Sequence, residues 1–152
     1  MGDKSEKVRI HRVTVNSSSS EIEMAINAIY SHVLGLWCDE VPLSMRIIEM
    51  ETKLCNREIT VCEFVATLVK SAIYHQQFLS SYPPNKVVEF LFCHLLGRMP
   101  IIPGELDQYQ ILLQENDLSQ VVDKLINSPE YNQFFGKDVV PYKRNEYIQT
   151  VN

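Results

Sequence analysis

Residues 86–100, with the sequence KVVEFLFCHLLGRMP, contain the most apolar helical segment of the chain and therefore decide its fold. Apolar side chains surround a helix over residues 86–96, and a helix that is apolar all round is expected at the centre of a domain. Gly97 follows directly and can end that helix in the left-handed conformation. Pro100 and Pro103 then hold the next loop extended, because proline cannot continue a helix.

Six other segments have apolar residues at helical spacing, which predicts an amphipathic helix in each. These segments are residues 20–34, 42–55, 60–72, 105–115, 118–126 and 129–135. Ser20 with Glu23, and Thr60 with Glu63, have the spacing of a capping box, which marks the start of a helix. Pro42 is a favoured first-turn residue. We therefore predict an all-α fold, a single compact helical domain of about seven helices.

The two ends of the chain lack this helical pattern. Residues 1–19 are predicted to form an extended, flexible N-terminal arm, because apolar and polar residues nearly alternate before a run of serines. Residues 20–144 form the predicted helical domain, and residues 145–152 form a C-terminal tail. The arm has a local charge of +2 and the rest of the chain −7, so the acidic excess lies in the folded part.

Length and composition describe an ordinary soluble globular protein. The chain has 152 residues, of which 45% are apolar and 22% charged, and its net charge is −5. This composition fits one folded domain. No basic stripe is present, so we expect no nucleic-acid binding. No apolar run reaches the roughly 18–20 residues of a membrane span, and the N-terminus resembles neither a secretory signal nor a transit peptide. Any membrane association should therefore be indirect.

The sequence offers no catalytic or cofactor-binding pattern. Glycine-rich phosphate loops, nucleophile elbows and metalloprotease helices are absent. His32, His75 and His94 are isolated, and Cys93 should point about 100° away from its neighbour His94 on a helix. The four cysteines form no Cys-x-x-Cys pair, so we expect reduced thiols and no zinc site. We predict a protein that is not an enzyme and has no catalytic, metal or cofactor site.

Four residues are candidates for contact with a partner protein: Arg98, Tyr142, Lys143 and Arg144. Arg98 follows the central helix, where a cation meets the negative end of the helix dipole. Arg98 has two possible roles: a structural ion pair with an acid such as Glu89 or Glu51, or a contact with a partner. We favour the ion pair. The other three follow a proline in the segment that leaves the domain, and exposed Tyr and Arg are enriched at interface hot spots.

Several short motifs, each a helix cap, a helix stop or a packing position, follow one another along the chain. They are Glu51-Thr52-Lys53-Leu54, Asn56-Arg57-Glu58-Ile59-Thr60-Val61, Glu63-Phe64-Val65, His94-Leu95-Leu96-Gly97-Arg98 with Pro100, Glu130-Tyr131, Phe135-Gly136 and Val140-Pro141-Tyr142-Lys143-Arg144. In this order and spacing they closely resemble the linker domain of phycobilisomes, the light-harvesting antennae of cyanobacteria and red algae. The resemblance covers roughly residues 21–144.

The resemblance implies a non-catalytic linker that binds phycobiliprotein trimers or hexamers, organises their assembly and tunes energy transfer in the antenna. Its implied partners are phycobiliproteins and other linker domains. Residues 101–105 and 109–113 look most like the repeats of the large core-membrane linker, which favours allophycocyanin, with phycocyanin possible. The implied location is the cytoplasmic or stromal side of the thylakoid membrane, as part of the phycobilisome.

The chain also departs from the family pattern. Arg57 stands where glycine is common, so we expect Asn56 to adopt the left-handed conformation of that turn. The acidic balance is unusual for a family that tends to be basic. Some relatives carry a bilin on a cysteine, and Cys38, between Trp37 and Asp39, looks the most exposed candidate. A bilin-carrying linker subunit is therefore the alternative function.

Overall fold

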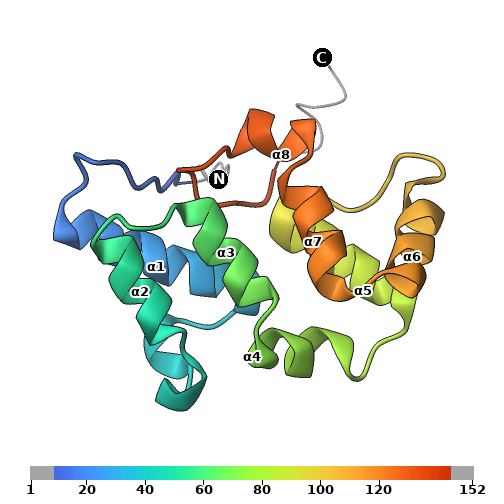
Figure 1. Cartoon of the computed structure of the whole chain (residues 1–152), viewed down its shortest axis with the longest axis horizontal. Coiled ribbons are helices and arrows are strands. Elements are labelled where there is room, and N and C mark those ends of the chain that lie inside the picture. Colours follow the sequence, from blue (N-terminus) through green and yellow to red (C-terminus); the bar gives the residue numbers. More distant parts are fainter. Residues whose placement is uncertain (1–8, 145–152) are drawn as a thin grey trace, which may run out of the picture.

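Eight α-helices make up most of residues 9–144, the part of the chain that this computed structural model describes (Figure 1). They are α1 (Ser19–Leu34), α2 (Ile48–Cys55), α3 (Val61–Val69), α4 (Ala72–Tyr74), α5 (Pro84–Leu91), α6 (Glu105–Glu115), α7 (Leu118–Ile126) and α8 (Pro129–Phe134). Two 3-10 turns, η1 (Cys38–Glu40) and η2 (Leu43–Met45), precede α2, and two π-helical turns, η3 (His75–Leu79) and η4 (Phe92–Leu96), extend α4 and α5. No strand occurs within residues 9–144, so the all-α prediction is confirmed.

The helix formed by α5 and η4 is central and buried, as the sequence predicts. It packs against α6, α7 and α8. Its buried side chains are Val87, Val88, Leu91, Phe92, Leu95 and Leu96. Gly97 ends it with φ of +75°, and a Cβ atom there would collide with the carbonyl oxygen of Tyr142. Only glycine therefore lets the C-terminal segment lie directly on the end of this helix.

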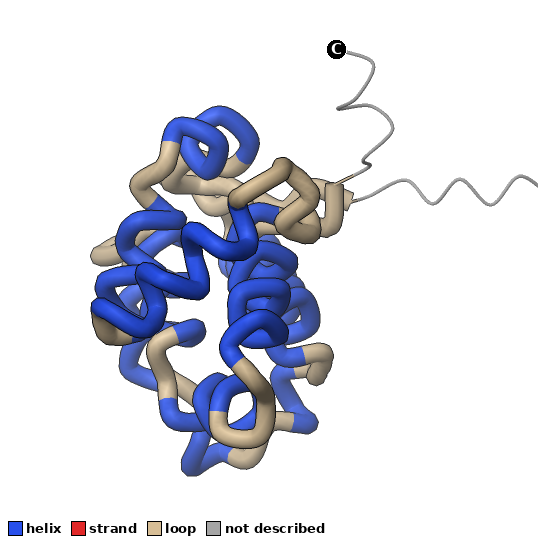
Figure 2. The backbone as a smooth tube through the Cα atoms, turned by 90° about the vertical axis from the view of Figure 1, so that its right-hand side faces the viewer, coloured by secondary structure: helices blue, strands red, loops and turns tan. Residues whose placement is uncertain are grey.

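The domain has two halves that share one core. α1, α2 and α3 pack together in one half, and α5, α6 and α7 in the other (Figure 1). α3 packs on α7 and joins the halves. α8 and the described parts of both terminal segments run across the top of the view in Figure 1. Figure 2 shows the same arrangement from the side, as helices joined by short loops.

The first helix begins earlier than predicted. Ser18, not Ser20, is the N-cap of α1, and its hydroxyl accepts a hydrogen bond from the Glu21 amide at 3.1 Å. The Glu21 carboxylate accepts one from the Ser18 amide at 2.7 Å. The serine run contains the Ser-x-x-Glu spacing twice, and the earlier start adds backbone hydrogen bonds such as Ile22 N–H to Ser18 O. By contrast, the predicted capping box at Thr60 and Glu63 is confirmed at the start of α3.

Two predicted helix boundaries in the first half are wrong. Pro42 does not begin a long helix, because only a 3-10 turn follows it and α2 begins at Ile48. The amide of Ile47 instead donates to the hydroxyl of Tyr30 at 3.1 Å, which fixes the chain before α2. The third helix ends at Val69, and Ser71 caps the separate helix α4. That extra cap is why residues 9–144 contain eight α-helices where about seven were expected.

Arg57, not Asn56, takes the left-handed conformation in the turn after α2. The φ angle of Arg57 is +60°, whereas that of Asn56 is −86°. The guanidinium of Arg57 donates to the carbonyl oxygens of Cys55, Thr14 and Ser17. These contacts offset the cost of a positive φ angle at a residue with a Cβ atom.

The described part of the predicted arm is paired with the C-terminal segment. Val13 is buried, and its amide donates to the Asp138 carbonyl oxygen at 3.0 Å. The Val140 amide donates to the His11 carbonyl oxygen at 2.9 Å, next to an isolated antiparallel bridge between Arg12 and Val139. Residues 1–8 of the predicted arm, and the tail at 145–152, lie outside the described residues. The predicted domain boundaries stay predictions.

Candidate partner-binding surface

Arg98 lies in a buried cluster of charges at the end of the central helix. Its side chain is 4% exposed, and its guanidinium donates to both carboxylate oxygens of Glu130 at 2.6 and 2.9 Å. It also donates to both oxygens of Glu105, at 2.9 and 2.7 Å, and to the Met99 carbonyl oxygen at 2.9 Å. The favoured ion-pair role is thus present, but the predicted partners, Glu89 and Glu51, are wrong.

Both carboxylates of this cluster stand in the first turn of a helix. Glu105 begins α6 and Glu130 lies near the start of α8, where the positive end of the helix dipole favours an anion. The hydrogen bonds from Arg98, with help from Arg144, lower the pKa of Glu130 despite its partial burial. Arg98 therefore ties three helix ends together, those of η4, α6 and α8.

Arg144 is the fourth member of the cluster and anchors the C-terminal segment. Its side chain is 5% exposed and donates to Glu130 at 2.9 Å. Its guanidinium carbon lies 3.7 Å from the ring centre of Phe134, a cation–π contact. Its amide donates to the Gly97 carbonyl oxygen at 2.9 Å. Arg98 and Arg144 are thus buried beneath the surface, whereas Lys143 is exposed.

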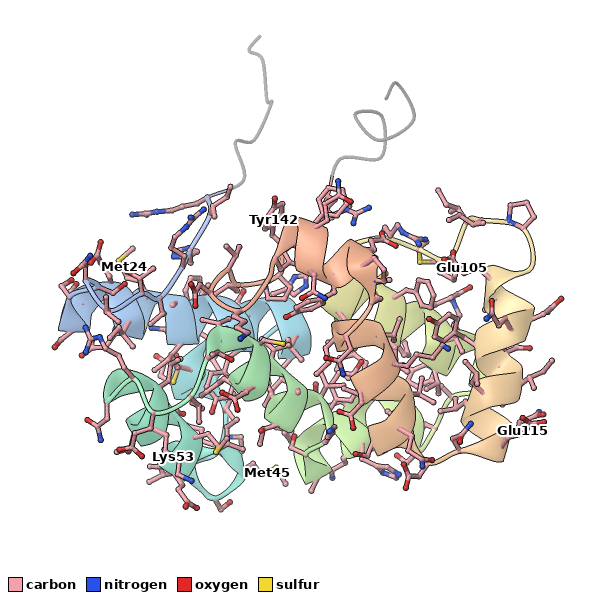
Figure 3. The ribbon with its side chains drawn as sticks, turned by 45° about the horizontal axis from the view of Figure 1, so that its top comes forward. Met24, Met45, Lys53, Glu105, Glu115 and Tyr142 are labelled. Carbon is pink, nitrogen blue, oxygen red and sulfur yellow. The ribbon has the colours of Figure 1, made fainter. Side chains whose placement is uncertain are left out.

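Tyr142 and Lys143 border a groove of about 510 Å³ between α1 and the two terminal segments. Figure 3 labels Met24 on α1 and Tyr142 on the C-terminal segment, which line this groove from two sides. Tyr142 is half-buried, with its ring 5.1 Å from that of Phe135 in an edge-to-face contact. Trp37, which is 59% exposed, also lines the groove. The cluster and the groove together place all four predicted contact residues in one region of the domain.

Two exposed apolar loops lie at separate ends of the molecule. One contains Met99, Ile101 and Ile102, before α6; the other contains Leu43 and Met45, before α2 (Figure 1). Exposed apolar residues gathered in a loop are a mark of interaction surfaces. Sequence reasoning missed the exposure of these side chains, and it was wrong to include Leu43 and Met45 in a helix over residues 42–55.

Cys38 does not have the environment of a reactive thiol. It is half-buried, and its pKa is raised by burial and by the carboxylate of Glu51. Glu51 is itself buried, where it accepts hydrogen bonds from Arg46 at 2.5 and 3.0 Å and from Tyr30 at 2.7 Å. This polar cluster, which joins α1 to α2, was also missed by sequence reasoning.

His94 is a structural residue in an aromatic environment. Its Nδ1 atom lies 2.8 Å from the Tyr74 hydroxyl, and its ring contacts those of Phe78 and Phe90. Burial, and to a lesser extent His32, lowers the pKa of His94 to about 3, so the ring is neutral at pH 7. Within residues 9–144, no group of three or more His, Cys, Asp or Glu side chains is placed to hold a metal ion. No helix in that range is long and apolar enough to cross a bilayer.

Comparison of the chain with known proteins gives one consistent family. Residues 17–144 match the family model described as Phycobilisome Linker polypeptide. The chain is 47% identical over 136 residues to Phycobiliprotein ApcE of Nostoc sp., covering 90% of this chain and 12% of that protein. It is 38% identical to a 27.9 kDa phycoerythrin-associated rod linker polypeptide of Microchaete diplosiphon, covering 85% and 51%. A 32.1 kDa phycocyanin-associated rod linker polypeptide of Mastigocladus laminosus is 36% identical, with 85% and 44% covered. The chain thus spans only part of each of these relatives.

Proposed function

This chain belongs to the phycobilisome linker polypeptide family, and on that premise we propose that it is a non-catalytic linker that binds phycobiliprotein trimers or hexamers. In this role it organises their assembly and tunes energy transfer in the antenna. The observation that carries the proposal is the family match over residues 17–144, which includes nearly all of the described domain.

Allophycocyanin is the favoured ring partner in this proposal, with phycocyanin as the other candidate and other linker domains as neighbours. The support is the likeness of residues 101–105 and 109–113 to the repeats of the core-membrane linker. Phycocyanin stays a candidate because one relative is named as phycocyanin-associated. The protein would act on the cytoplasmic or stromal side of the thylakoid membrane, as part of the phycobilisome.

The mechanism that we propose is geometric. A rigid helical domain with contact surfaces at separate ends fills the centre of a ring, breaks its symmetry and adds interface area that bare rings lack. The exposed loops before α2 and α6, together with Tyr142 and Lys143, supply those surfaces. Arg98 and Arg144 contribute indirectly, because both side chains are buried. Arg98 binds the first turns of α6 and α8, and Arg144 holds the C-terminal segment in place.

Size-exclusion chromatography with separate allophycocyanin and phycocyanin rings tests this proposal. The expected result is co-elution of the chain with one of the rings, at a larger size than the bare ring, and a shifted bilin emission maximum. Emission matters because a linker that changes the surroundings of a bilin changes its energy level. If the chain forms a complex with neither ring, the proposal that this chain acts as a linker by itself loses most of its support.

A further inference from the structure

Two short segments at the ends of the domain make a basic edge on an otherwise acidic protein. Residues 9–12 and 137–144 together contain five cations and one anion, whereas residues 13–136 contain seven cations and fifteen anions. Of the five cations, Arg144 is buried and paired with Glu130, and the other four are exposed: Arg9, Arg12, Lys137 and Lys143. The bridge between Arg12 and Val139 brings the two segments side by side. The charges of the chain are therefore segregated in space, and the negative total conceals a positive edge.

The groove beside this edge combines cations with apolar surface. Arg9 and Lys143 are its exposed cations, Trp37 and Tyr142 its aromatic side chains, and Met24 part of its apolar wall. No acidic residue lines this groove within the described part of the chain. The carboxylates of Asp39 and Glu40 line a neighbouring hollow, which shares Trp37 with this groove.

The C-terminal segment also has main-chain donors with no acceptor in the described part of the chain. The amide of Val140 is paired with His11 and that of Arg144 with Gly97. Between them, the amides of Tyr142 and Lys143 donate to no group within residues 9–144. An added extended peptide binds main-chain donors of this kind. Because consecutive N–H groups of an extended segment point to opposite sides, one of these two donors can serve a peptide in the groove.

We infer that this groove binds an acidic, extended segment of the partner protein. Its carboxylates lie against Arg9 and Lys143, and an aromatic or aliphatic side chain lies against Trp37. The groove volume of about 510 Å³ falls within the range of about 300–1,000 Å³ found for small-molecule pockets. Charge complementarity then selects an acidic partner and speeds its association. The inference rests on the proposed function only for the identity of that partner, a phycobiliprotein ring.

The single tryptophan of the chain makes the groove directly observable. Because Trp37 is the only tryptophan, its emission reports on occupancy of the groove. The full chain is titrated with a blocked peptide of glutamates around a central phenylalanine, and with the same peptide carrying lysines. The test variant is Arg9→Glu with Lys143→Glu. The matched control is Lys86→Glu with Lys124→Glu, which changes the net charge equally at exposed sites outside the groove.

We expect the acidic peptide alone to change the emission of Trp37, and the test variant to bind it at least about tenfold more weakly than the control variant. Equal binding by the two variants, or no response of the wild-type protein, would overturn the inference. An emission change that depends on protein concentration alone would assign the groove to a second copy and overturn it as well. A change in Trp37 emission when residues 145–152 are removed, with no peptide present, would assign the groove to the chain's own tail and would also overturn the inference.

The same variants with phycobiliprotein rings separate this inference from the proposed function. Ring binding that is weakened only in the Arg9→Glu, Lys143→Glu variant supports both. Equal ring binding by wild type and that variant overturns the groove as the docking site and leaves the linker role intact. Peptide binding without any ring binding by the wild type supports the groove and counts against the linker role.

Discussion

Replacing Arg98 with methionine removes a buried cation and leaves two carboxylates without their main partner. The Arg98 side chain is 4% exposed and holds Glu105 and Glu130 by bidentate hydrogen bonds. Removal of one partner from a buried ion pair costs about 3–5 kcal/mol. The two carboxylate side chains are 15% and 27% exposed, and Arg144 still binds Glu130. We therefore expect the lower end of that range, about 3 kcal/mol, from a total stability of about 5–15 kcal/mol.

Urea unfolding followed by circular dichroism measures this loss. Lys70→Met is the matched control, because it removes a cation from a surface pair with Asp123 whose side chains are 30% and 51% exposed. The control should cost at most about 1 kcal/mol. Arg98→Lys, which keeps the charge but loses the bidentate geometry, should fall between the two. A loss for Arg98→Met no larger than that of the control would refute the reasoning that this cluster ties three helix ends together.

Three further changes test other parts of the fold. The neutral, buried ring of His94 has a pKa of about 3 in the folded state, against 6.5 in the unfolded state. As the pH drops, the unfolded chain therefore binds a proton at His94 before the folded chain does. The free energy of unfolding should fall below about pH 6.5 for that reason. Unfolding measured across pH should give a slope of up to about 1.4 kcal/mol per pH unit from this residue, absent in His94→Gln. Gly97→Ala should destabilise the protein well beyond Gly104→Ala in thermal unfolding. Both residues have a positive φ angle, which costs alanine about 1–2 kcal/mol, but only at Gly97 does the new Cβ meet the backbone of the C-terminal segment. Ser18→Ala should cost about 1 kcal/mol through loss of the α1 cap, and Ser20→Ala almost nothing; equal losses for the two serines would contradict the assigned cap.

The helices were predictable where local chemistry alone fixes their ends. The Thr60 and Glu63 capping box, the left-handed Gly97 and the apolar period of the central helix all act within a few residues of the chain. The predictions are wrong where a contact with a residue distant in the sequence fixes the local structure. The start of α2 depends on Tyr30, which binds the Ile47 amide, and the turn at residue 57 depends on carbonyl oxygens of the N-terminal segment.

For the candidate site, the sequence suggested residues but not their geometry, and their contact with a partner stays a prediction. A cation after the central helix indicated a paired Arg98, yet nothing local selects Glu130, which is 32 positions away, over other acids of the chain. The basic edge was hidden for a similar reason, because its two segments meet only through the pairing of Arg12 with Val139. The net charge of the chain does not show where the charges lie. A negative total therefore suggested that the chain lacks the positive surface that the resemblance implied.

The most direct test of the linker role is sedimentation velocity of the chain mixed with allophycocyanin or phycocyanin, followed through bilin absorbance. A domain that fills the centre of a ring and breaks its symmetry should bind once per ring. The linker role therefore predicts one faster-sedimenting species whose amount saturates at equal numbers of chains and rings. Unchanged sedimentation of both rings, at any excess of the chain, would contradict it.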